Sequence, residues 1–281
     1  MTTGSITTTT HDVFLPEVWI PKINDAREKS LVAVKAVWVW PEAQKGKADT
    51  FNIPNVTAST VTQKSTGITN TVTYETFTET KVTLSIDQHW YAAHAPEWRT
   101  KALAPYDFVA IYVKRAAYAV SEKQDATLTA RFDGLSTNVV GILAEDLTDA
   151  HLRISRRMLN DANVPAEERS WLFSPAMIEG LLSIDRYMSM DFVAKGGISS
   201  GNLPNILYGA QVLETQNLEG SDAAGRDGAL IHKEAFVAGY PLMSVRFNFD
   251  DIDTMATKFL VHGLWGDVEN RDNHGVWVKG R

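Results

Sequence analysis

The side chains that could do chemistry are scattered, and few of them share a useful spacing. His89 and His94 lie five positions apart, whereas two metal ligands on one helix face lie four apart. A metal site also needs donors that converge, and no acidic residue has a suitable spacing to this pair. The sequence therefore predicts no metal site at these histidines.

The sharpest acidic cluster is Asp250, Asp251 and Asp253. A divalent cation such as Ca²⁺ needs several oxygens that converge on one point. Acidic residues beside a turn are more typical of a solvated surface. We therefore interpret the cluster as solvated and predict no bound metal.

Patterns typical of enzymes are incomplete. The glycine-rich stretch KGGISSGN, residues 195–202, lacks the Lys-Ser/Thr ending of a phosphate-binding loop, and we interpret it as a mobile loop. The chain has no cysteine, so it has no thiol nucleophile. The sequence therefore predicts that the chain is not an enzyme, with no catalytic residue and no cofactor.

Three arginines, Arg153, Arg156 and Arg157, stand on one predicted helix. We interpret them as facing solvent or another subunit, and a phosphate-binding role is the minor alternative. Composition gives no reason to favour phosphate. The net charge of -7 argues against nucleic-acid binding through a strongly basic surface.

Composition sets further bounds. The 281 residues are 44% hydrophobic and 22% charged, which is ordinary for a globular protein. The absence of cysteine excludes disulfides and thiolate metal sites. No stretch approaches the ~20 apolar residues of a membrane span, and the N-terminus lacks the basic and apolar segments of a signal peptide. Eight tryptophans are many for this length, and tryptophan is enriched at interfaces.

One element has no obvious core of its own. Residues 56–87 read VTASTVTQKSTGITNTVTYETFTETKVTLSID, with alternating Val82, Leu84 and Ile86 and a reversal at residues 64–67. Two strands of about fifteen residues would form a ribbon roughly 50 Å long. A two-stranded ribbon is marginal alone in water, so its contacts must come from elsewhere.

The rest of the chain alternates helices and strands. The pattern predicts helices over 24–31, over 105–130, over 149–162 with Thr148 as its cap, and from Pro175 onward. Strands are expected at 171–175, 209–218 and 243–253, with a flexible loop over 219–230. Turns are expected at Gly266 and at 272–275. Residues 147–218 would form a small α+β unit.

Several segments, each weak alone, occur in an order that resembles one family. They are FLPEVWIPKINDAREKSLV, KADTFNIPNV, VTYETFTET, LSIDQHWYAAH, RSWLFSPAMIEGLL, NLPNILYGAQVLETQNL and LIHKEAFVAGY. In this order they resemble the major capsid proteins of tailed bacteriophages with the HK97-type fold. The resemblance covers nearly the whole chain.

The resemblance implies an α+β, HK97-like fold. It implies an N-terminal arm over 1–45 and an extended hairpin, the E-loop, over 46–88. It also implies a peripheral domain with a long spine helix over 89–146 and 219–281, and an axial domain over 147–218. In this family the E-loop lies across the next subunit. The expected subunit contacts are Trp19, Lys64, Thr66, Val72, Tyr74, Phe77, Arg156 and Arg157.

The resemblance also implies partners. The chain would assemble with itself into hexamers and pentamers of an icosahedral shell around double-stranded DNA, without sequence-specific binding. A portal protein and separate scaffolding or decoration proteins are further expected partners, since no fused scaffolding segment precedes the arm. The location would be the virion, after assembly in the host cytoplasm, with no membrane. Lys64 has no matched asparagine and acid, so covalent cross-linking is not expected.

Three alternatives stay open at the level of sequence. An encapsulin-like compartment shares the fold and would enclose protein cargo. A secreted β-rich binding module would explain the Thr-rich ribbon, but the long helix and the missing signal peptide disfavour it. An enzyme is the weakest alternative.

Overall fold

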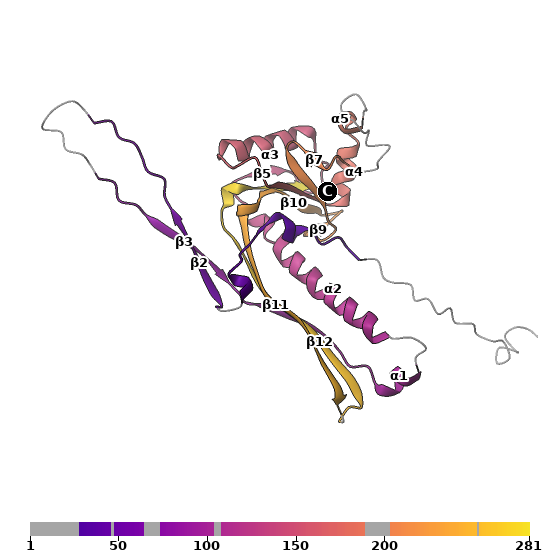
Figure 1. Cartoon of the computed structure of the whole chain (residues 1–281). Helices are drawn as coiled ribbons and strands as arrows, with labels where there is room; N and C mark the ends of the chain where they lie inside the picture. The colour runs from indigo at the N-terminus through magenta and orange to yellow at the C-terminus, as the bar shows by residue number, and fades with distance from the viewer. Residues whose placement is uncertain (1–27, 46–47, 65–73, 104–107, 189–202, 252) are drawn as a thin grey trace, which may run out of the picture.

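The computed structural model describes residues 28–45, 48–64, 74–103, 108–188, 203–251 and 253–281. Within these residues, two sheets and a long helix form the body, and a two-stranded ribbon extends from it (Figure 1). The mixed helix and strand content agrees with the predicted α+β class. Among the described helices, none is both long and apolar enough to cross a membrane.

The larger sheet has seven strands within the described residues. In spatial order they are β5 (Val139–Gly141), β13 (Gly275–Gly280), β10 (Gly225–His232), β6 (Arg169–Phe173), β8 (Ala210–Glu214) and β7 (Ile206–Leu207), and β9 (Gly220–Ser221) pairs with β10. All five residues of β6 are buried, because strands flank it on both edges and helices cover it.

Three helices accompany this sheet: α3 (Asp149–Asp161), α4 (Pro175–Leu182) and α5 (Asp185–Met188). The Thr148 side chain accepts a hydrogen bond from the His151 amide and caps α3. The Ser174 side chain accepts one from the Met177 amide, and a proline at the first position starts α4. A core that includes Leu152, Leu159, Trp171, Phe173, Met177 and Leu181 joins the helices to the sheet.

The smaller sheet has the order β1 (Trp38–Val39), β11 (Phe236–Asp251), β12 (Ala256–Glu269) and β4 (Gln88–His94). The long helix α2 (Phe108–Thr129) packs on β12 and β4, and the short helix α1 (Trp98–Leu103) precedes it. The contact core is Ala116, Val120, Phe259, Val261 and Trp265. This long helix is the one that the periodicity of residues 105–130 predicts.

Short 3₁₀ turns connect these elements: Ala33–Ala36, Ala43–Lys45, Phe132–Gly134, Lys233–Ala235 and Asp272–His274. The turn Ala33–Ala36 belongs to the N-terminal segment, and a buried hydrogen bond attaches this segment to the body. The Asp125 carboxylate accepts a hydrogen bond of 2.9 Å from the Ala33 amide. The segment that follows residue 27 is thereby fixed to the long helix.

The ribbon consists of β2 (Thr50–Val56) and β3 (Glu79–Ser85). The two strands pair in antiparallel register from Thr50 with Ser85 to Val56 with Glu79. Figure 1 shows the ribbon extending away from both sheets, with its root near β11. The predicted hairpin is therefore present at its base. Of the predicted reversal at residues 64–67, all but Lys64 lies outside the described residues.

Several predictions from the pattern are confirmed. The helix at 149–162 is α3, the helix from Pro175 is α4, and the strand at 171–175 is most of β6. The turn at 272–275 is the 3₁₀ turn Asp272–His274. Position 105 lies outside the described residues, and the described part of its helix ends within one residue of the predicted end.

Three predictions are wrong. Gly266 lies inside β12, not in a turn. A glycine occupies this strand position because the Ser85 carbonyl approaches so closely that a Cβ would lie 1.9 Å from it. The expected loop over 219–230 contains β9 and most of β10. Residues 28–31 are not helical, and the rest of the helix expected there lies outside the described residues.

The predicted domain limits remain a prediction. The seven-stranded sheet takes β5, β10 and β13 from the two expected peripheral segments and β6, β7 and β8 from the expected axial segment. The strand pairing therefore crosses both predicted boundaries.

Candidate functional site

The ribbon beyond β2 and β3 is the most exposed part of the described chain. Residues 57–64 and 74–78 have no regular strand pairing, and every one of them is exposed. The two arms stay together through polar contacts, such as the Thr57 hydroxyl donating to the Thr78 carbonyl at 2.8 Å. Yet the ribbon carries apolar side chains: Val61 is 100% exposed, Tyr74 90% and Phe77 56%.

The root of the ribbon, in contrast, is fixed to the body. Ile53, Leu84 and Ile86 are buried in a cluster with Ala43 and Val237. The close passage of the ribbon over Gly266 of β12 adds a second point of attachment. A well-packed root therefore holds an arm whose apolar residues remain largely exposed among the described residues.

A second exposed apolar surface lies along β11. Met243, Val245, Phe247 and Phe249 alternate on one strand face and are 50%, 39%, 44% and 57% exposed. We call these four residues the β11 apolar row. Helix α2 covers the neighbouring strand β12, whose Phe259 is buried, whereas these four residues of β11 stay exposed. The rings of Phe247 and Phe249 stack on each other with their centroids 5.2 Å apart.

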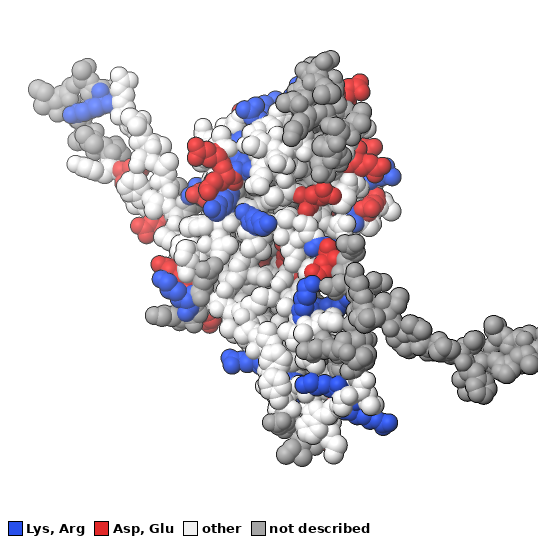
Figure 2. Space-filling view, turned by 45° about the vertical axis from the view of Figure 1, so that its right-hand side comes forward, with Lys and Arg blue, Asp and Glu red and all other residues white. Residues whose placement is uncertain are grey.

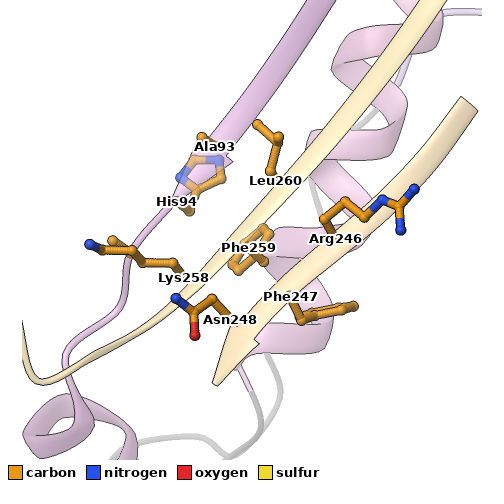
Figure 3. A pocket seen from close by; sticks show the side chains of 9 residues that line it. Ala93, His94, Arg246, Phe247, Asn248, Lys258, Phe259 and Leu260 are labelled. Atoms are coloured by element: carbon orange, nitrogen blue, oxygen red, sulfur yellow. The ribbon is translucent and has the colours of Figure 1, made fainter. Parts of the chain in front are cut away.

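A groove of about 410 Å³ adjoins this row (Figure 3). Side chains from β4, β11 and β12 and the residue after β4 line it: Ala93, His94, Ala95, Arg246, Phe247, Asn248, Lys258, Phe259 and Leu260. Its lining contains the cations Arg246 and Lys258 and no carboxylate. This combination fits an apolar segment with an acidic edge and contains no nucleophile paired with a base.

The most buried carboxyl groups serve the fold. Burial raises the pKa of Asp125, which the hydrogen bonds from Asn217 and from the amides of Ala33 and Val34 lower in part. Burial also raises the pKa of Asp267, against the lowering effect of Arg131, whose Nε donates to it. Both carboxyls connect segments far apart in sequence, and neither opens into the groove of Figure 3.

Five of the eight predicted contact residues fall in the described chain. Lys64, Tyr74 and Phe77 are exposed together on the ribbon. Arg156 and Arg157 are exposed on α3, and Arg157 pairs with Asp161 at 3.8 Å. The other three, Trp19, Thr66 and Val72, lie outside the described residues. The structure thus groups the ribbon residues and sets the two arginines apart from them; their contact with other subunits stays a prediction.

The histidines considered for a metal do not converge. His89 Nε2 lies 3.4 Å from His262 Nδ1, whereas the His94 ring stacks on Tyr112. For the acidic cluster, the side chains at positions 250 and 251 lie outside the described part of the structure.

Sequence reasoning missed the β11 apolar row. The signal was present in MSVRFNF, where Met243, Val245 and Phe247 alternate with polar residues. Such alternation predicts one apolar face. It does not show whether a helix of the same chain covers that face, which here depends on the position of α2.

Comparison with known proteins gives matches in structure alone. No family model matches the chain, and no curated protein matches it in sequence. A structure from Mycobacterium phage Che8 matches with a TM-score of 0.80 at 20% identity, over 94% of this chain and 97% of that one. The capsid structure of cyanophage P-SCSP1u matches with a TM-score of 0.78 at 14% identity, over 97% and 94%.

A third match is the asymmetric unit of the bacteriophage PhiM1 mature capsid, with a TM-score of 0.73 at 13% identity over 94% of this chain and 91% of that one. The matches cover both sheets, because each spans nearly the full length of both chains. The chain therefore has the HK97-type α+β fold of these phage capsid structures.

Proposed function

We propose that this chain is a major capsid protein that assembles with itself into the hexamers and pentamers of an icosahedral shell around double-stranded DNA. The ribbon carries this proposal. It has a buried root, an exposed apolar arm and no core of its own, and the chain shares its fold with phage capsid structures over almost its full length.

The physical argument is one of unmet contacts. Exposed Tyr74, Phe77 and Val61 gain about 25 cal/mol for each Å² of apolar surface that a neighbour covers. The backbone of 57–64 and 74–78 has unpaired edges, which can pair with another chain. A copy of the same chain supplies a partner at every position of a closed shell.

The β11 apolar row is the second surface that supports assembly. Its four side chains and the adjoining groove lie along the strand pair that extends from the body opposite the ribbon (Figure 1). A subunit with two separate apolar projections can contact more than one neighbour. Many moderate contacts then add up to a stable shell.

Charge fits enclosure of a genome better than direct binding. In Figure 2, Lys and Arg side chains are mixed with Asp and Glu over the upper and middle parts of the body, only Lys and Arg are seen at its lower end, and the ribbon is mostly uncharged. The net charge is -7. A shell that encloses DNA needs no strongly basic surface, because containment does not depend on affinity. The proposed role is structural and involves no enzyme activity, cofactor or membrane.

The proposal extends to partners and place. A portal protein, and separate scaffolding or decoration proteins, would complete the particle. Assembly would take place in the host cytoplasm and the product would be the virion. The contact residues proposed on this chain are Trp19, Lys64, Thr66, Val72, Tyr74, Phe77, Arg156 and Arg157.

Deletion of residues 60–78 with a short glycine-serine bridge tests the proposal. We expect a soluble subunit with unchanged circular dichroism that forms no shells by negative-stain electron microscopy, whereas the full chain forms shells of uniform size. Normal particles from the deletion variant would contradict the role of the ribbon. Nuclease-protected DNA in particles from infected cells supports the capsid, and a packaged enzyme in place of DNA would support a protein compartment instead.

A further inference from the structure

The two sheets are connected at one junction. β10 leads through the turn Lys233–Ala235 into β11, and β12 leads through the turn Asp272–His274 into β13. Hydrogen bonds join these two passages: the Asn270 amide donates to the Ala235 carbonyl at 2.8 Å, and Asn270 Nδ2 donates to the Glu234 carbonyl at 3.0 Å. Any group bound between the two turns would link both passages at once.

Three metal-ligating side chains meet at this junction: His232, Glu234 and His274. Their donor atoms all lie within 4.8 Å of one another. His274 Nδ1 lies 3.9 Å from Glu234 Oε2, and the two imidazole rings lie edge to face with centroids 5.6 Å apart. Both histidines are buried, at 4% and 6% exposure, and Glu234 reaches them from the surface.

One of these donors lacks a partner. His274 Nδ1 is buried and has no hydrogen bond within the described residues. A buried polar atom without a partner destabilises the fold, so its presence calls for an explanation. A cation at this point would accept the lone pair of that nitrogen and remove the cost.

His232 also has a lone pair directed at the turn. Its Nδ1 accepts the Glu234 amide at 3.3 Å, which is long for a hydrogen bond. An acceptor Nδ1 in a neutral imidazole is the nitrogen available to a metal, and this long contact is the one that ligation would replace.

We infer that His232, Glu234 and His274 form a site for Zn²⁺ or a similar first-row divalent cation. Imidazole and carboxylate donors bind Zn²⁺ at about 2.0–2.2 Å, so a tetrahedral site holds them about 3.3–3.6 Å apart. The 3.9 Å separation of His274 and Glu234 needs only a small closing movement. A water molecule would take the fourth position.

Charges of both signs surround the site. Arg169 and Arg271 act on the His232 imidazole with positive charge, and Glu168 and Glu234 act on it with negative charge. Lys233 pairs with Glu168 at 3.2 Å. The site therefore depends on the Glu234 carboxylate to offset the added charge of the cation, which makes that residue the sharpest point for a test.

The consequence is a metal clamp between the sheets. A cation bound to the folded chain and not to the unfolded one stabilises it by an amount that grows with metal concentration. The clamp would hold the end of β10 against the start of β13. It would oppose opening of the junction and leave the ribbon and the β11 apolar row accessible.

Metal titration of the untagged full-length chain tests this inference. We expect one equivalent of Co²⁺ to bind, with the strong visible absorption of a tetrahedral site, and excess Zn²⁺ to displace it and raise the melting temperature. Glu234→Gln should weaken Zn²⁺ binding at least tenfold. His274→Gln and His232→Gln should each abolish the Co²⁺ spectrum.

His89→Gln is the matched control, because His89 belongs to the surface pair with His262 and lies on a different strand from the junction. It should bind Co²⁺ and Zn²⁺ like the unaltered chain. Absence of binding to the unaltered chain, or binding lost in His89→Gln and kept in Glu234→Gln, overturns the inference. Should a histidine variant fail to fold, Glu234→Gln decides the question, since its side chain is exposed.

Discussion

Strands β6 and β3 show two ways in which one chain uses extended backbone. All five residues of β6 are buried, and its neighbours β10 and β8 satisfy both edges. Of the seven residues of β3, only Leu84 is buried, and its one partner is β2. The first strand completes its contacts within the chain, whereas the second leaves most of them open.

The difference lies in what surrounds each strand. β6 has no alternation of buried and exposed residues, because helices and strands enclose it. Its run of Trp171, Leu172 and Phe173 suits burial on both faces. β3 is polar except at Val82 and Leu84, which alternate with polar residues, and it reaches its core only at the root. Buried strands in this molecule stabilise the subunit, and exposed ones are available to other copies.

Trp171→Ala should produce the largest effect on the subunit. The indole is fully buried, donates to the Leu207 carbonyl at 2.9 Å and stacks on Phe173. Loss of the side chain should lower the free energy of unfolding by about 3–5 kcal/mol, measured by urea denaturation. A loss below about 1 kcal/mol would show that the β6 core tolerates a cavity and would break the contrast between the two strands.

Leu84→Ala should cost less, about 2–4 kcal/mol, because the ribbon root has a smaller core. We expect a subunit that still folds, with faster hydrogen exchange at residues 50–56 and 79–85, where the root loosens. Equal exchange in both forms would show that strand pairing alone fixes the root. Val82→Ala on the same strand, at a half-buried position, is the milder control.

A fall in pH should change the contribution to stability in opposite directions at Asp125 in the body and at Glu75 on the ribbon. Burial raises the pKa of Asp125 in the folded chain above its ordinary value of 3.8. At a pH between 3.8 and that raised pKa, the folded chain therefore binds more protons than the unfolded chain. Its contribution to stability therefore rises as pH falls through the folded pKa, by at most about 1.4 kcal/mol per pH unit. Urea denaturation should show that the free energy of unfolding of the unaltered chain, relative to that of Asp125→Asn, is larger at about pH 4.5 than at pH 7. The same difference in free energy of unfolding at both pH values would contradict a raised pKa for Asp125.

Glu75 on the ribbon should behave in the opposite way. Hydrogen bonds from the Thr60 side chain and amide lower its pKa below 4.5. The contribution of that contact is present above 4.5 and is lost as pH falls through the folded pKa. Carbon-detected NMR titration of the Glu75 carboxyl measures the shift directly, and Thr60→Val should return the pKa toward its ordinary value.

The double variant Tyr74→Ser, Phe77→Ser should have the smallest effect on the isolated subunit. Both side chains are exposed, so the free energy of unfolding should change by no more than about 0.5 kcal/mol. Assembly should nevertheless fail or slow, as light scattering would show. Thr76→Ser between them is the control. Normal assembly of the double variant would indicate that backbone pairing, without these two rings, holds the ribbon to its neighbour.

The sequence predicted best where local chemistry decides. Thr148 and the helix after it, Pro175 and the next helix, and the buried run of β6 are each fixed by residues close together in the chain. These are the elements whose limits agree within one or two residues. The long helix also follows from its own periodicity.

Prediction failed where a distant segment decides. Gly266 resembles a turn residue, but its role is to admit the Ser85 carbonyl from the ribbon root. Gly228 resembles part of a loop, but an added Cβ would lie 2.9 Å from both the Leu172 carbonyl and Met177 Sδ, so strand β10 needs a glycine there. The junction of His232, Glu234 and His274 was missed for the same reason, because Glu234 and His274 lie forty positions apart in the sequence.

The bulge in β11 between Gly239 and Leu242 gives the strand pair the geometry of a lever. About ten residues of β11 extend beyond it, or about 33 Å at the usual rise of a strand. A rotation of about 10° at the bulge would therefore carry the far end of β11 through about 6 Å. β12 and β4 would move with this part of β11, because they pair along the same segment. A movement of that size would let one polypeptide meet neighbours at both the flatter and the more sharply curved positions of a closed surface.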